Sequence, residues 1–168
     1  MLEKFFGKFL KQVGLPAEWR TPRYLQTRYD PSLVMALTHQ HRTLNLLLVE
    51  ASSAAQLGAY DETGSILEQF EFALEDHLKQ ERDRLHPYLA EHIRGGDGEE
   101  TLKDMHACSA LAQRGVAAFL DRYRDKPVDA SSLAQFEHDI EAVGEKLSQD
   151  MEREEAMFYT LYLPPEAY

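Results

Sequence analysis

Imidazole nitrogens and carboxylate oxygens are donors that iron, manganese and zinc accept in proteins. Six such side chains occur in this sequence at or beside positions where a helical pattern would otherwise require core residues. They are His41, His77, Glu81, His106, Asp150 and Glu154. Together they could bind a metal ion or a pair of metal ions, provided that the elements carrying them bring them together.

Two pairs among these residues, His77 with Glu81 and Asp150 with Glu154, are four residues apart. This spacing puts both members of a pair on one helix face, one turn apart, so that one helix can serve two neighbouring metal ions. A buried, ionised carboxylate without a partner costs a large part of the stability of a domain. Because a divalent metal removes this cost and a carboxylate can bridge two metals, a dinuclear site is the simplest interpretation.

Clusters of helix-breaking residues divide the chain into four long runs with helical periodicity. The clusters span residues 29–31, 58–61, 95–98 and 125–129. Short connections make consecutive helices antiparallel neighbours, which predicts an all-α fold, an up-down-up-down four-helix bundle. Residues equally far from a turn then lie at the same depth. By this measure His41 and His77 are level about the first turn. His106 and Asp150 are level about the third.

Apolar residues spaced three and four apart define the inward face of each run. In the first run, His41 takes an inward place between Leu37 and Leu44. In the second run, His77 and Glu81 interrupt an otherwise apolar face. Both runs therefore carry metal-binding side chain types on the face that should be buried.

The fourth run repeats this break, because Asp150 and Glu154 follow an apolar face in the same register. A rotated helix would instead turn Met151 and Glu155 inward, but the continuous apolar face favours Asp150 and Glu154. In the third run, His106 lies beside the apolar face. Its assignment depends on the match in depth.

A single inward histidine is more often a hydrogen-bonded core residue than a ligand, and His77 with Glu81 alone would usually be an exposed helix pair. Agreement in register, depth and donor type across four helices is what favours a bound metal. The other histidines outside the first 29 residues fall off the inward faces, and we do not expect them to bind metal. They are His39, His86, His92 and His138.

Three motifs carry a resemblance to a known family. They are LTHQHRTL at residues 37–44, HLKQERDRLHP at 77–87 and EEAMF at 154–158. The first two are similar to the opening helices of the hemerythrin-like, or HHE cation-binding, family, and the third resembles its last motif. The resemblance covers about residues 30–162. It implies a non-haem di-iron centre used for oxygen carriage, for sensing of oxygen or nitric oxide, or for iron-sulfur cluster repair.

The resemblance also implies roles for individual residues. His41, His77 and His106 match the family's histidine ligands, and Glu81 and Glu154 match its bridging carboxylates. Asp150 stands where the last helix of the family would carry histidine, and the third helix has one histidine where oxygen carriers tend to have two. This carboxylate-rich set should favour the oxidised, harder metal and disfavour reversible oxygen binding.

Composition sets further bounds on the function. A chain of 168 residues fits a single domain, and a formal charge of −11 with a pI near 5.0 argues against a nucleic-acid partner. No apolar stretch is long enough for a membrane span, and the start lacks the features of a secretory signal, which predicts a cytoplasmic protein. Cys108 is the single cysteine, so an intramolecular disulfide is excluded.

We expect three segments: residues 1–29, a bundle at 30–162 and a C-terminal tail at 163–168. The first segment contains an amphipathic helix with an apolar face from Leu2 to Val13 and lysines opposite it. This helix could bind a partner or a membrane surface. We favour docking of this helix on the bundle or on a second subunit. Docking on a second subunit would make a homodimer.

The sequence thus predicts a protein with a di-iron centre, with manganese or adventitious zinc as other occupants, that senses oxygen or nitric oxide or handles iron. It would be an enzyme if a substrate reached an open coordination position. The second hypothesis is a bundle without metal that acts as a regulatory protein-interaction module. Asp150 is the main support for this alternative.

Overall fold

The computed structural model describes residues 28–93 and 96–168, except for the side chains of 96–99 and of Met105, His106, Cys108 and Leu111. The described chain is helical and contains no strand. Its helices are α2 (Leu33–Gln56), α3 (Tyr60–Gln80), α4 (His86–His92), α5 (Gly96–Asp125) and α6 (Leu133–Arg153). Two π-helical turns, η1 (Glu81–Leu85) and η2 (Glu154–Phe158), continue α3 and α6, and two 3₁₀ turns follow, η3 (Tyr159–Leu161) and η4 (Pro165–Ala167).

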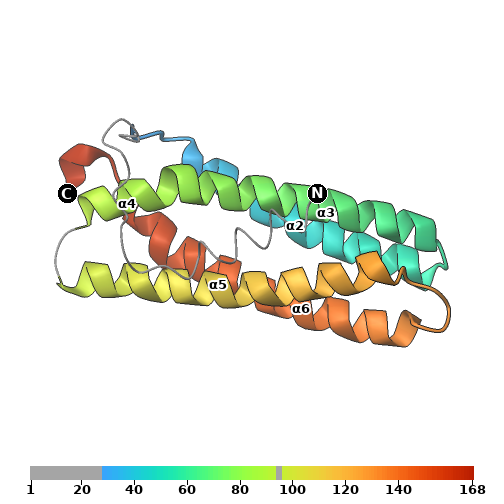
Figure 1. The fold of residues 1–168 in the computed structure, drawn as a ribbon. Helices are drawn as coiled ribbons and strands as arrows, with labels where there is room; N and C mark the ends of the chain where they lie inside the picture. The colour runs from blue at the N-terminus through green and yellow to red at the C-terminus, as the bar shows by residue number, and fades with distance from the viewer. Residues whose placement is uncertain (1–27, 94–95) are drawn as a thin grey trace.

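The four long helices pack side by side in a bundle (Figure 1). Helix α2 contacts α3 and α6, and helix α5 contacts the same two helices. Each long helix therefore has two neighbours among the others, and their inward faces share one interior. The prediction of an all-α fold is confirmed.

The turn between α2 and α3 depends on Gly58, whose φ of 75° lies in the left-handed region. Its backbone N–H donates to Ala55 O at 3.0 Å, and that of Ala59 donates to Ala54 O at 2.9 Å. These two bonds form a Schellman motif, which satisfies the last carbonyls of α2 and ends the helix. The chain reverses here, so α3 runs back along α2 (Figure 1).

Helix α6 is preceded by hydrogen bonds between backbone N–H groups and a side chain. The Asp129 carboxylate accepts hydrogen bonds from the backbone N–H groups of Ser131 and Ser132, at 2.8 Å and 2.9 Å. These bonds satisfy donors that have no partner within a helix near its start. The chain leaves α5 and turns into α6 within a few residues.

The buried apolar residues form two clusters. The larger one surrounds Phe70 and Phe136 on the side of the α2–α3 turn, and the smaller one surrounds Tyr88 and Phe158 near the C-terminus. On α2, Leu44 belongs to the larger cluster and Leu37 to the smaller one. His41 lies between them in sequence.

The same division recurs along the other helices. Leu74 and Leu85 belong to different clusters, and so do Met151 and Phe158. On α5, Val116 belongs to the larger cluster and Leu102 to the smaller one. A polar layer therefore crosses the bundle where one apolar cluster ends and the other begins.

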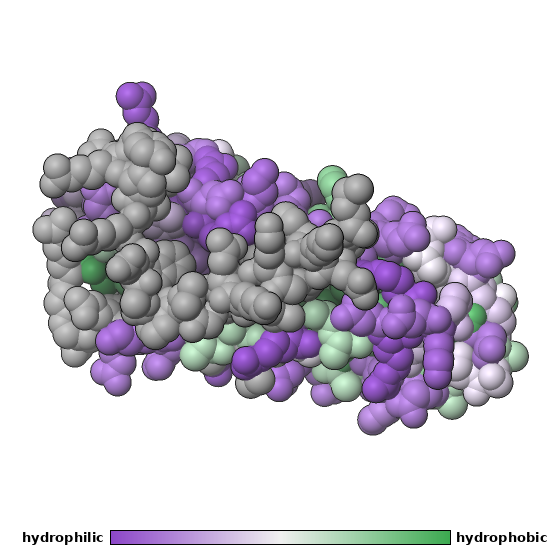
Figure 2. Space-filling model, in the orientation of Figure 1, coloured by the Kyte–Doolittle hydropathy of each residue, from purple (hydrophilic) through white to green (hydrophobic). Residues whose placement is uncertain are grey.

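No described helix combines the length and the apolar composition that crossing a membrane requires. On the face seen in Figure 2, hydrophilic residues cover most of the described surface, and hydrophobic residues form small, separate patches.

The predicted amphipathic helix near the N-terminus lies outside the described residues. The predicted C-terminal tail, residues 163–168, contains η4 and returns to the bundle. The Tyr88 hydroxyl donates to Leu163 O, and the Tyr168 ring lies 5.0 Å from the His92 ring, measured between ring centroids. The three-segment division itself stays a prediction.

Candidate metal centre

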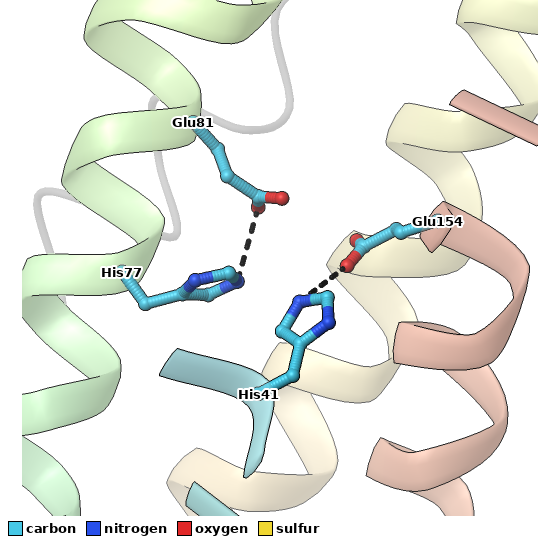
Figure 3. A group of neighbouring side chains, drawn as sticks. All are labelled: His41, His77, Glu81 and Glu154. Carbon is cyan, nitrogen blue, oxygen red and sulfur yellow. Dashed lines mark ion pairs between the residues drawn. The ribbon is translucent and has the colours of Figure 1, made fainter. Parts of the chain in front are cut away.

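Four side chains of the polar layer converge on one point of the bundle interior (Figure 3). They are His41 from α2, His77 from α3, Glu81 from η1 and Glu154 from η2. One donor atom from each lies within 4.8 Å of the others. The three residues other than Glu154 are each 2% exposed, and Glu154 is 6% exposed, so water has little access to any of them.

Both histidine rings present Nε2 to this point. His41 Nε2 lies 3.4 Å from Glu154 Oε2, and His77 Nε2 lies 3.6 Å from Glu81 Oε2. The ring centroids of the two histidines are 4.7 Å apart. These are distances at which one or two cations could bind all four groups, because metal ligands lie about 2 Å from the ion.

The Nδ1 atoms of both rings face away from the centre and have partners of their own. His41 Nδ1 is 2.8 Å from Glu155 Oε1, and His77 Nδ1 is 3.2 Å from Gln40 Oε1. The Gln40 amide in turn donates to Asp76 at 3.1 Å. An ionised carboxylate and an amide oxygen only accept, so Nδ1 carries the proton and Nε2 keeps its lone pair for a cation.

Two hydroxyl groups complete the layer. Ser109 Oγ on α5 donates to Glu154 Oε1 at 2.9 Å. The Tyr159 hydroxyl on η3 donates to Glu81 Oε1 at 3.0 Å, and its oxygen lies 3.1 Å from His41 Nε2. Polar contacts thus run across the bundle without a break, and within the described part of the chain neither glutamate pairs with lysine or arginine.

Each of the two glutamates is the first residue of a π-helical turn. The backbone N–H of His86 bonds to Glu81 O, and that of Tyr159 bonds to Glu154 O, both across five residues. π-Helical turns of this kind are rare and often occur at functional sites. Here the same local distortion occurs at both carboxylates.

The electrostatics of the layer favour a bound cation. Burial, followed by the charge of Glu154, raises the pKa of Glu81 well above its usual value. Burial and the neighbouring His41 lower the pKa of His77 to about 3, so its ring is neutral. Burial and the two glutamates raise the pKa of Tyr159. Two neighbouring carboxylates and two imidazoles, of which that of His77 is neutral, make a donor set that suits a divalent or trivalent metal.

The structure brings together four of the six residues predicted from the sequence: His41, His77, Glu81 and Glu154. His106 lies on α5, but its side chain is among those that the structure does not describe. Asp150 is half-buried at the edge of the layer, where burial and the charge of Glu154 raise its pKa to about 6. As ligands, all six stay a prediction.

Asp150 lies at the edge because α6 buries Met151 instead, with 4% of its surface exposed. Three and four residues after Leu147, the sequence offers an aspartate and a methionine for the same inward place. The methionine transfers more favourably out of water, so it joins the larger apolar cluster. Glu154, three residues after Met151, is buried as well, whereas Glu155 is exposed, so the rotated register occurs only in part.

The histidines predicted to lie away from the site do so in part. His39 and His138 are exposed, and His92 stacks on Tyr88 with ring centroids 4.2 Å apart. His86 is half-buried, and its charge contributes to the lowered pKa of His77.

Sequence reasoning did not assign Tyr159 or Glu155 to the site. An α-helix would turn a residue five places after Glu154 away from the centre, and the sequence predicted an inward Glu155 only for the rotated register of the last helix. The sequence does contain a pattern shared by the two segments that form π-helical turns. Glu81 and Glu154 are both followed four residues later by a large apolar residue, Leu85 or Phe158, and then by a side chain with a nitrogen or oxygen donor.

The family comparison agrees with this geometry. The hemerythrin HHE cation binding domain matches residues 32–162, which is most of the chain and includes all four converging side chains. The chain belongs to this family. No curated protein and no solved structure matches it. The hemerythrin-like domain thus contains a buried group of histidine and glutamate side chains that could hold a metal ion.

Proposed function

We propose that this hemerythrin-like domain binds two non-haem iron ions, or manganese, in the polar layer of its bundle. The observation that carries the proposal is the convergence of four buried donors within 4.8 Å, two imidazoles and two carboxylates. Imidazole and carboxylate suit iron and manganese, and carboxylates bridge such ions. Burial and the charge of Glu154 disfavour an ionised Glu81 in the metal-free site, and a bound cation would remove this penalty.

In this proposal His41 and His77 are terminal ligands through Nε2, and Glu81 and Glu154 bridge. Asp150 and His106 are further ligands predicted from the sequence. Asp150 is near enough to raise the pKa of Glu81, which supports its inclusion. The order of helix contacts supports the finer description of the fold as an up-down-up-down four-helix bundle.

Bound iron would supply a centre that exchanges electrons and binds small gaseous molecules. The residues of the chain hold it, fix both histidine rings through Nδ1 and exclude water by burial. We infer a role in sensing oxygen or nitric oxide, or in handling iron. A set rich in carboxylates favours the oxidised metal, which argues against reversible oxygen carriage. A cytoplasmic location stays a prediction from the sequence.

Metal analysis tests this proposal directly. Protein purified without chelator, or reconstituted anaerobically with ferrous iron, should contain about two metal ions per chain. Glu81→Gln and Glu154→Gln should lose most of this metal, because each removes a bridging negative charge while keeping the shape of the side chain. Glu137→Gln on α6 is the matched control and should keep it. No metal in the reconstituted wild type, or equal metal in all four proteins, would contradict the proposal.

A second candidate function rests on a separate observation. Ser109 and Tyr159 donate to the two glutamates, so the polar layer is hydrogen-bonded even without a cation. Such a layer could serve as a specificity device in a regulatory bundle that binds a protein partner. This candidate predicts that Glu81→Gln leaves partner binding and thermal stability nearly unchanged.

A further inference from the structure

The hydroxyl of Tyr159 lies inside the group of donors. Its oxygen is 3.1 Å from His41 Nε2 and 3.0 Å from Glu81 Oε1, the atoms of two residues from different helices. Tyr159 is 5% exposed, and its ring stacks on that of His41 with centroids 5.5 Å apart. Among the described residues, the metal candidates His41 and Glu81 both contact this one phenol.

The protons available do not satisfy this arrangement. His41 donates through Nδ1 to Glu155, so its Nε2 has only a lone pair to offer. Glu81 Oε1 accepts the hydrogen bond of the Tyr159 hydroxyl. The Tyr159 hydroxyl has one proton for two acceptors, and its own oxygen carries lone pairs that face the same region. A cation at this point could bind all three electron-rich atoms, His41 Nε2, Glu81 Oε1 and Tyr159 Oη.

The backbone places Tyr159 here by an unusual means. In an α-helix, with about 100° per residue, Tyr159 would point roughly 140° away from Glu154. The π-helical turn η2 contains one additional residue, and the Tyr159 N–H bonds to Glu154 O. This change of register brings the phenol back to the face of Glu154.

We propose that Tyr159 binds ferric iron at this site through its phenolate oxygen. The inference rests on the proposed function, because it needs the same metal centre. Phenolate is a hard, anionic donor that matches a hard trivalent ion. The bond that forms is Fe–Oη and the bond that breaks is Oη–H, and the proton leaves to the solvent, as it does when other acidic ligands bind metal. This ligand adds negative charge to a set that is already rich in carboxylates.

Spectroscopy of iron-loaded protein tests the inference without any activity assay. A phenolate bound to ferric iron gives a charge-transfer absorption in the visible region, and Raman excitation within that band enhances the vibrations of the tyrosine ring. Wild type loaded with ferrous iron and oxidised with ferricyanide should show both. Tyr159→Phe should lose both signals when the spectra are compared at equal amounts of bound iron.

The control is Tyr162→Phe, three residues later in the same segment. Tyr162 is also buried, but its hydroxyl oxygen accepts from the backbone N–H of Asp30, away from the polar layer. This variant should keep the band. Iron-loaded wild type without tyrosine vibrations, or Tyr159→Phe that keeps them, would overturn the inference and leave the metal site intact. Wild type that takes up no iron would overturn the proposed function as well.

Gallium provides a second measurement that does not depend on oxidation. Gallium is a redox-silent trivalent ion, and a phenol that becomes phenolate on binding changes its ultraviolet absorption. Titration of metal-free wild type should give this difference spectrum, and Tyr159→Phe should give a smaller one by one tyrosine. Equal spectra for the two proteins would contradict the inference even if iron loading altered the fold of the variant.

Discussion

His41 shows how one residue can be prepared for metal before any metal binds. Its Nδ1 lies 2.8 Å from Glu155 Oε1, and its Nε2 points into the group of donors. The Glu155 side chain is 41% exposed, so it reaches water while it holds the buried ring. A carboxylate behind a ligating histidine fixes the tautomer and orients the ring.

Removal of this carboxylate should therefore weaken metal binding without removing a ligand. We expect Glu155→Ala to lower metal affinity by about 10–100-fold. Competition with a chelator of known affinity measures the change. Glu152→Ala removes the same charge from an exposed position on α6 and is the matched control. If both variants bind metal as tightly as wild type, Glu155 does not position His41.

The lowered pKa of His77 predicts how the stability of the metal-free protein depends on pH. Its pKa falls from 6.5 to about 3 in the folded state, chiefly because of burial. The neutral ring therefore stabilises the fold above about pH 6.5, and this contribution is lost as pH falls, because only the unfolded chain takes up the proton readily. The raised pKa of Glu81 acts in the opposite direction. A comparison of two proteins is needed to separate them.

The comparison is between wild type and His77→Gln, both free of metal. The stability of wild type relative to the variant should drop by about 1 kcal/mol between about pH 6 and about pH 5. Urea denaturation at the two pH values measures it. His39→Gln changes an exposed histidine of α2 and should follow wild type at both. A constant difference between wild type and His77→Gln would show that His77 titrates normally.

At the level of elements, the sequence predicted the helices and most of the inward faces. Leu37, His41 and Leu44 are all buried as their spacing requires. The π-helical turns were not predicted, because apolar spacings of three and four fit a continuous α-helix nearly as well. A π turn changes the register by one residue, which is why the α-helical spacing did not predict an inward Tyr159. Asp150 and Met151 show the same limit, since spacing allows either to face inward.

Two glycines, one in the turn that joins α2 to α3 and one in the following helix, test the account of this turn. Gly58 has a φ of 75°, whereas Gly64 lies in α3, where an added Cβ would meet nothing within 4 Å. We expect Gly58→Ala to cost about 1–2 kcal/mol, because an alanine is strained in the left-handed region. Gly64→Ala should stabilise by about 0.5–1 kcal/mol, because it strengthens a helix interior. Thermal or urea denaturation measures both. The same sign for both changes would contradict this account of the turn.

At the scale of the whole molecule, the described part of the chain contains two apolar clusters with a polar layer between them. α2, α3 and α6 with its continuation η2 contribute donors to that layer, and α5 contributes Ser109. Without a cation, the layer interrupts the apolar packing of the bundle, and burial together with Glu154 raises the pKa of Glu81. A metal bound there would hold three separate helices at one level, so site formation and bundle stability should be coupled.

This coupling can be measured by removing the metal. A ligand present at about 100 times its Kd stabilises the folded state by about 2.7 kcal/mol. For a chain of this size, that corresponds to a Tm change of roughly 5–10 °C. Addition of a chelator to metal-loaded wild type should lower Tm by about this amount, and His39→Gln should respond equally. Glu81→Gln should show no response, because it holds little metal at the start. A Tm unchanged by the chelator, in wild type shown to have lost its metal, would mean that the bundle does not need the metal and would favour the regulatory alternative.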